Sequence, residues 1–166
     1  MLILKVKQTQ ITMKKIFVIG CLFLLAACKS KQSTAETKVE TLSIVKTETI
    51  PADLKTKAYA LGKRVLLTCN TSRFKPFTTS EATASVIKNT TQERLSSVCH
   101  KFRVKYGNFK DIYLAEVLKN NKEGSYIFRY KAKYERDFAN KELRVTMDKD
   151  QKVSAIKSTD WIEKIN

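Results

Sequence analysis

The sequence predicts an α+β domain in which three N-terminal helices pack against a four-stranded antiparallel sheet. Apolar residues recur at helical spacing as far as Tyr106, and from Phe109 onward they alternate at the period of two that strands have. Short polar turns separate the strands, and helices grouped before strands are typical of α+β folds. Residues 53–166 are long enough for one domain with a single hydrophobic core.

The first helix is predicted by an apolar stripe on one face. Asp53 is a candidate N-cap, because its carboxylate can accept hydrogen bonds from the free amides of the first turn. The stripe recurs at intervals of three and four residues and consists of Leu54, Ala58, Leu61 and Val65. Cys69 lies at the edge of this stripe, so we expect it near the core.

Two capping boxes predict the second and third helices. Thr78 and Glu81 have the required spacing, in which the hydroxyl accepts an amide and the glutamate reaches back, and Thr90 and Glu93 repeat it. We expect Gly107 to end the third helix, because glycine adopts a left-handed conformation without strain. The apolar stripe of this helix consists of Leu95, Val98, Cys99, Phe102 and Tyr106.

Four strands follow the helices. The first spans residues 112–118, and the turn NNKEG separates it from the second, residues 125–136. The third spans residues 142–147, and the turn DKDQ leads to the fourth, residues 153–158. In the second strand, aromatic residues share one face and basic residues, beginning with Arg129, lie on the other. We therefore expect one face to be buried and the other to contact water.

Residues 1–27 have the layout of a bacterial signal peptide. Lys14 and Lys15 precede the run IFVIGCLFLL, which is about ten residues long, whereas a membrane-spanning helix takes roughly twenty. The run ends in the order LAAC, which resembles the lipobox of bacterial lipoproteins. This resemblance implies cleavage before Cys28 and a diacylglyceryl group on its thiol; an ordinary signal peptide or a short buried helix is the alternative. Met13 is an alternative start.

The lipoprotein resemblance also predicts a location. Residues 28–52 are rich in Ser, Thr, Lys and Glu and contain no aromatic residue, so we expect a flexible tether between the lipid and the domain. Lys29 stands where an aspartate would resemble an inner-membrane retention signal. The prediction is therefore an outer-membrane lipoprotein that faces the periplasm, with display at the cell surface as the alternative.

The chain is strongly basic, with a formal net charge of +16. Removal of the signal region with its four lysines leaves the mature protein near +12. The basic residues are spread along the whole domain, without an arginine-rich block or a nucleic-acid motif. Nucleic acid is therefore not an expected partner. General surface charge is the first explanation of the basic composition, and weak contact with the acidic headgroups of a membrane is the second.

Two cysteines remain in the mature domain. Cys21 leaves with the signal and Cys28 is taken by the lipid, so Cys69 and Cys99 are left. Both lie on or near the apolar stripes of their helices, and two thiols in an oxidising compartment can form a disulfide. A pair of buried free thiols is the alternative.

A family resemblance rests on the end of the helical half and on the last strands. The helix exit KYGNF and the segment LRVTMDKDQKVSAIKS, after three helices, resemble the nuclear transport factor 2-like superfamily and its uncharacterised domains in exported bacterial proteins. The resemblance covers residues 53–161 and implies a sheet curved around the helices like a cone, with a pocket at the wide end. Members include ligand binders, isomerases and dimerising modules, so the fold does not assign a function.

Aromatic residues are the candidate pocket lining. Buried tyrosine hydroxyls need hydrogen-bond partners and therefore often mark a wet or ligand-filled cavity, although plain core packing is the alternative. The candidates are Phe102, Tyr126, Phe128, Tyr130, Tyr134 and Trp161.

No catalytic group or cofactor is predicted. Glu116 is the one candidate acid, because it shares a strand face with Ile112 and Leu114, although Tyr113 and Val117 belong to a rival apolar face. The only histidine, His100, follows Cys99 directly, and adjacent residues on a helix do not face each other.

No metal site is predicted either. The segment after Asp148 and Asp150 lacks the glycine and the closing glutamate of a calcium loop. A single histidine and no close cysteine pair argue against zinc.

These patterns favour a non-enzymatic lipoprotein. Its domain is expected to bind a small apolar or amphipathic ligand, or a protein partner, in the periplasm. One alternative is an isomerase- or dehydratase-like enzyme that uses Glu116 as an acid. The other is a scaffold that forms a homodimer through its sheet.

Overall fold

The computed structural model describes residues 42–163, so the predicted signal peptide and Cys28 lie outside the described residues. The strands form one antiparallel sheet in the order β1-β2-β3-β4-β5. Helices pack against this sheet, which confirms the α+β class. The elements in chain order are β1 (Leu42–Val45), the short 3-10 helix η1 (Thr47–Thr49), α1 (Ala52–Thr71), α2 (Ala84–Asn89), α3 (Gln92–Tyr106), β2 (Phe109–Asn120), β3 (Ser125–Tyr134), β4 (Lys141–Met147) and β5 (Val153–Asp160).

The prediction of four strands is wrong, because β1 adds a fifth strand at one edge of the sheet. β1 is antiparallel to β2, with Ile44 opposite Leu118. It lies inside residues 28–52, the segment predicted to be a flexible tether. The polar composition of that segment does not prevent four residues from pairing with a neighbouring strand, so the folded domain begins before Asp53.

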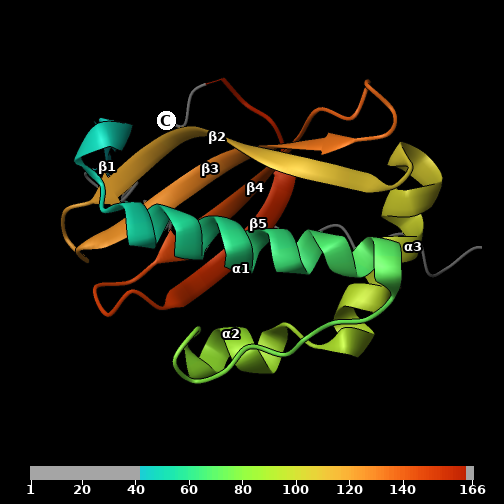
Figure 1. Ribbon diagram of the computed structural model, residues 1–166, viewed down its shortest axis with the longest axis horizontal. Coiled ribbons are helices and arrows are strands. Elements are labelled where there is room, and N and C mark those ends of the chain that lie inside the picture. The colour runs from blue at the N-terminus through green and yellow to red at the C-terminus, as the bar shows by residue number, and fades with distance from the viewer. Residues whose placement is uncertain (1–41, 164–166) are drawn as a thin grey trace, which may run out of the picture. The chain divides into compact units, whose positions relative to one another are not determined.

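The core lies between α1 and the sheet. α1 crosses one face of the sheet and α3 packs beside α1 (Figure 1). All four residues of the predicted α1 stripe are buried, from Leu54 to Val65. Gly62 allows the close approach, because a Cβ at this position would lie 2.8 Å from Val145 Cγ2 and 2.9 Å from Leu143 Cδ2.

The N-cap of α1 lies two residues before the predicted cap, Asp53, and the N-cap of α3 lies one residue after the predicted cap, Thr90. Pro51 is the N-cap of α1 and Asp53 lies in its first turn. The N-cap of α3 is Thr91, whose hydroxyl accepts a hydrogen bond from the amide of Arg94 at 3.4 Å. Gly107 ends α3 with a positive φ of 77°, as expected from its sequence.

α2 begins later than its predicted capping box. The N-cap is Thr83, so the prediction of a helix start at Thr78 is wrong. Thr78 and Glu81 still interact, because the Glu81 carboxylate accepts the Thr78 amide at 2.9 Å, but they form a turn. Glu81 also accepts two hydrogen bonds from Arg64 of α1, at 2.7 and 2.9 Å. These bonds connect the segment before α2 to α1.

The Arg64–Glu81 pair predicts a pH dependence of stability. The hydrogen bonds from Arg64 lower the pKa of Glu81 to about 2, against about 4.3 in an unfolded chain. Because the folded pKa is the lower one, the pair stabilises the fold fully above the unfolded pKa, and this contribution is lost as pH falls toward 2. We expect Glu81→Gln to lower the free energy of unfolding at pH 7 and to have a smaller effect at pH 3. Urea titrations at both pH values measure this, and an equal effect at pH 3 would contradict it.

Candidate functional site

A cavity of about 340 Å³ lies between α1, α3 and the β4–β5 part of the sheet. Its volume is within the range of small-molecule sites, at the lower end. Most of its wall is apolar. The lining consists of Val65, Leu66 and Cys69 of α1, Asn89 and Thr90 at the end of α2, Arg94, Leu95, Val98, Cys99 and Phe102 of α3, and Leu143, Ile156 and Ser158 of the sheet.

α3 provides one wall of the cavity because it packs only in part against the rest of the domain. Cys99 and Tyr106 are the only buried residues described in this helix. Val98 is 50% exposed although it belongs to the apolar stripe. The stripe predicted for α3 therefore lines a hollow along part of its length instead of filling the core.

The cavity has one polar end. Asn89 is the last residue of α2, Thr90 follows it, and Arg94 lies in the first turn of α3. The Arg94 guanidinium donates a hydrogen bond from Nη1 to Asn89 Oδ1 at 2.9 Å. Ser158 of β5 adds a hydroxyl to the wall. The rest of the lining is apolar or belongs to the disulfide.

A disulfide joins the two helices at the cavity wall. Cys69 of α1 and Cys99 of α3 are bonded, with their Cα atoms 4.6 Å apart. The sequence left open a disulfide or two buried free thiols, and the structure has the disulfide. Both cysteines line the cavity, so the bond fixes α3 as its wall.

The aromatic residues predicted to line a pocket mostly fill the core. Phe128, Tyr130 and Tyr134 of β3 are buried, and Phe102 is the one predicted lining residue that reaches the cavity. Burial raises the pKa of Tyr134 to about 12 and raises that of Tyr130 as well. The Tyr130 hydroxyl has no hydrogen-bond partner among the described residues. Tyr126, half-buried at the start of β3, packs against the core.

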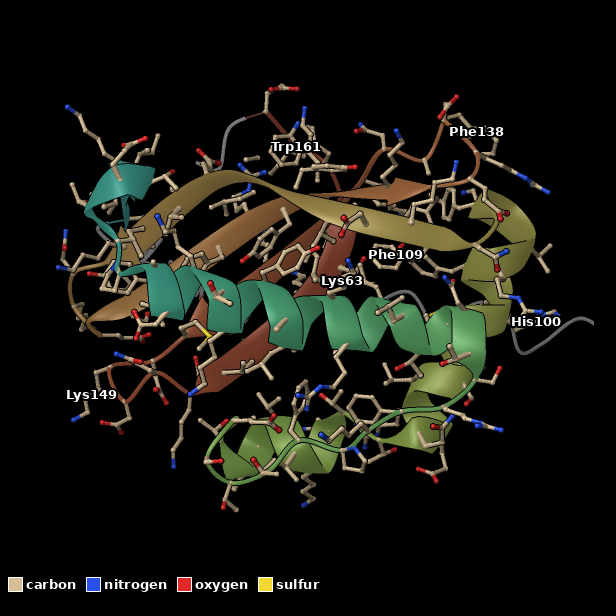
Figure 2. All side chains as sticks on the ribbon, viewed as in Figure 1. Lys63, His100, Phe109, Phe138, Lys149 and Trp161 are labelled. Carbon is tan, nitrogen blue, oxygen red and sulfur yellow. A yellow bond between two sulfur atoms is a disulfide. The ribbon has the colours of Figure 1, made fainter. Side chains whose placement is uncertain are left out.

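Trp161 lies on the opposite face of the sheet from the aromatic core. Its ring covers the Arg129 guanidinium at 4.4 Å and Lys131 Nζ at 4.5 Å. Figure 2 shows Trp161 at the upper side of the domain, away from α1. The aromatic residues predicted to share one pocket are therefore divided between two faces of the sheet.

Glu116 also lies on this outer face. A register shift between Leu114 and Glu116 breaks the alternation of β2, so Leu114 pairs with Tyr130 while Glu116 pairs with Arg129. A bulge of this kind places one extra residue in a strand and reverses which side chains face the core after it. Neither face proposed from the sequence is therefore buried along its whole length, and Glu116 does not line the cavity.

The outer face contains a buried ion cluster. Arg129 is 0% exposed, although the alternation predicted that it would contact water. It donates hydrogen bonds to Glu142, with Nε at 3.1 Å, to Glu116, and to the carbonyl oxygen of Ile162 at 2.6 Å. Burial acts to lower the pKa of Arg129, but the bonds to Glu142 and Glu116 outweigh it and raise the pKa. This arrangement is a satisfied structural network.

A second polar cluster connects α1 with β2. The Tyr59 hydroxyl donates to Asp111 Oδ1 at 2.7 Å, and Lys63 Nζ lies 2.8 Å from the same hydroxyl and 3.0 Å from Asp111. Figure 2 shows Lys63 at the edge of α1 that faces β2. None of the three residues lines the cavity, so we assign the cluster to the packing of α1 on the sheet.

Other candidate chemical groups from the sequence are separate from the cavity. His100 is exposed and lies on the outer side of α3 (Figure 2). Asp148 Oδ1 accepts the amides of Asp150 and Lys152, each at 2.9 Å, within the β4–β5 turn. Residues 42–163 contain no group of three or more side chains placed to ligate a metal, and none of their helices has the length and apolar character to span a bilayer.

Comparisons with known proteins add no relative: no family model, curated protein or solved structure matches this chain. The arguments on function therefore depend on the geometry of the domain and on the sequence.

The sequence did not indicate the cavity itself. Its wall is built from α1, α3 and the β4–β5 hairpin, which are distant in the chain, and Val65, Leu95 and Val98 look like ordinary core residues in the sequence. The available signal was the stripe of α3, which contains more apolar residues than the helix buries.

Proposed function

We propose that the protein is a lipid-anchored, exported binding protein that takes up a small apolar or amphipathic molecule in the cavity between α1, α3 and the sheet. The observation that carries this proposal is the cavity of about 340 Å³, whose wall is mostly apolar and whose lining contains no carboxylate. Such a site favours ligands through burial of apolar surface. Chemistry on the ligand is not part of the proposal.

The export part of the proposal is supported by the sequence and by the disulfide. The order LAAC after an apolar run places Cys28 where a lipoprotein is acylated. Disulfides persist in oxidising compartments such as the periplasm and are rare in the cytosol. The Cys69–Cys99 bond agrees with export, and the basic sequence after Cys28 favours the periplasmic side of the outer membrane.

The relation to the nuclear transport factor 2-like cone belongs to the same proposal. Helices packed against one antiparallel sheet support it, whereas the fifth strand, β1, goes beyond the pattern expected from the sequence. The cavity lies between helices and sheet, where a small ligand can be enclosed.

Two observations favour a binder over the alternatives. Glu116, the acid required by the enzyme alternative, lies on the outer face and pairs with Arg129. The dimerising scaffold needs an apolar outer face, but side chains from β3 to β5 on that face include Lys131, Arg144 and Lys157. Charged residues are depleted at the centres of stable protein interfaces.

Substitution of Val98 tests the binding site. Val98→Glu places a charge in the cavity wall, and we expect the full-length protein from its own host to lose its co-purifying ligand in native mass spectrometry. Val104→Glu is the control, because Val104 lies on the same helix, is 61% exposed and does not line the cavity. A wild-type protein without ligand, or a ligand retained by Val98→Glu, would overturn the proposed site.

The anchor has a separate test. Each buried methylene of an acyl chain contributes about 0.8 kcal/mol, so two or more chains hold a protein firmly at a membrane. We expect Cys28→Ser to move the protein from the membrane fraction to the soluble fraction. Unchanged membrane association would contradict lipidation at Cys28.

A further inference from the structure

The charges around the cavity are distributed unevenly. Arg94 is the one charged side chain in the described lining. An apolar cavity with a single cation at its wall is complementary to a molecule that has an apolar body and one negative charge.

The Arg94 guanidinium has donors available for such a group. It forms no ion pair among the described residues, and its one side-chain hydrogen bond there, from Nη1 to Asn89 Oδ1, is to a neutral amide. A guanidinium has five N–H donors in a planar fork that matches carboxylate and phosphate oxygens. Thr90 and the Asn89 amide lie at the same end and can add hydrogen bonds to an anionic group.

The other end of the cavity differs in charge. Phe102 lies eight residues after Arg94 on α3, which corresponds to about 12 Å along the helix. One cation packs on its ring: Lys141 Nζ lies 5.5 Å from the centre of the Phe102 ring. Lys141 is already neutralised by Asp160 at 2.6 Å. An anion is therefore favoured at the Arg94 end and not at the Phe102 end.

We infer that the ligand is a single-chain amphiphile with an anionic head, which Arg94 binds at the polar end while the apolar chain runs along α3 toward Phe102. This inference rests on the proposed function and specifies the ligand class for the same cavity. A carboxylate and a phosphate monoester share the chemistry that Arg94 recognises.

Calorimetric titration with matched probes tests the inference. The probes are decanoate and decyl phosphate, both below their micelle concentrations, and decan-1-ol below its solubility limit. The protein is the full chain with Cys28→Ser, so that no detergent competes for the cavity. We expect decanoate or decyl phosphate to bind about three- to fivefold more tightly than decan-1-ol, since exposed ion pairs contribute modestly. The stronger of the two identifies the head group, and its advantage should decrease at high salt.

Variants of Arg94 assign the effect to this side chain. Arg94→Gln should remove the preference for the anionic probe while decan-1-ol still binds, and Arg94→Lys should keep part of the preference. Arg103→Gln is the control, because Arg103 lies on the same helix but does not line the cavity. Equal binding of decan-1-ol and both anions, or a preference that survives Arg94→Gln, overturns this inference and leaves the proposed function intact. If none of the three probes binds, the proposed function fails as well.

Discussion

Removal of the Cys69–Cys99 disulfide is expected to lower the free energy of unfolding by roughly 3 to 4 kcal/mol. The two cysteines are separated by 30 residues in the sequence, and the bond restricts the unfolded chain over that loop. For a domain of this size, the loss corresponds to a decrease in melting temperature on the order of 10 to 15 °C. Thermal unfolding of Cys69→Ser/Cys99→Ser beside the wild type measures the effect.

The structure also predicts which part of the domain loses the most local stability without the disulfide. The middle of α3 has little buried surface apart from Cys99, whereas its C-terminal end packs through Tyr106 against Tyr134. Without the disulfide, we expect faster amide exchange in the first half of α3 and a cavity that no longer has a fixed wall. Exchange in β3 and β4 should change less, because these central strands are paired on both sides.

Reduction of the wild-type protein is the control for the double variant. Both should have the same lowered melting temperature, and reductant should have no effect on the variant. A wild-type melting temperature that is unchanged by reduction, under conditions where mass spectrometry shows both thiols free, would contradict the stabilising role of the bond.

The success of the sequence in predicting the helices and most strands has a physical basis. A helix that covers a sheet must bury one apolar stripe. The sequence of α1 shows this stripe in the helical spacing of its buried residues Leu54, Ala58, Leu61 and Val65. A strand with one face on the core has apolar residues at every second position, as β4 has at Leu143, Val145 and Met147. These local patterns are sufficient for the fold class.

Two features depend on neighbours in space and were not predictable. β1 is a strand because β2 offers a free edge to Ile44 and Val45, not because its own composition requires one. The bulge near Glu116 changes which side of β2 faces the core, and no residue in that strand signals it as a glycine would.

The candidate site shows the same limit. An apolar residue predicts burial, but it does not distinguish a filled core from a cavity, so Phe128 was a candidate lining residue while Val98 was not. The position of Arg94 at the polar end depends on how the α2–α3 junction meets α1 and β5, which are separate segments of the chain.

Glu142 is expected to be the most sensitive charged residue of the domain. It is fully buried on the outer face of the sheet, where its carboxylate accepts hydrogen bonds from Arg129, Arg144 and the Thr159 hydroxyl, the last at 3.0 Å. Arg129 and Arg144 are directly opposite each other on β3 and β4. Like charges in such a pair destabilise a sheet unless an anion lies between them, and Glu142 provides that anion.

Glu142→Leu should therefore destabilise the domain by about 3 to 5 kcal/mol, because it leaves Arg129 buried with less compensation. Glu116→Leu is the matched control. Glu116 is partly exposed, and its removal leaves the Arg129–Glu142 pair in place, so the loss should be clearly smaller. Urea unfolding of the two variants measures the difference.

A double variant separates the cost of an unpaired charge from the value of the pair. Burial of two charges is costly, and replacing both with apolar residues of similar size is often neutral or stabilising. We therefore expect Arg129→Met/Glu142→Leu to recover most of the stability lost in Glu142→Leu alone. Additive losses in the double variant would mean that Arg129 stabilises the sheet by packing against Trp161 and by its bond to the Ile162 carbonyl, independently of Glu142.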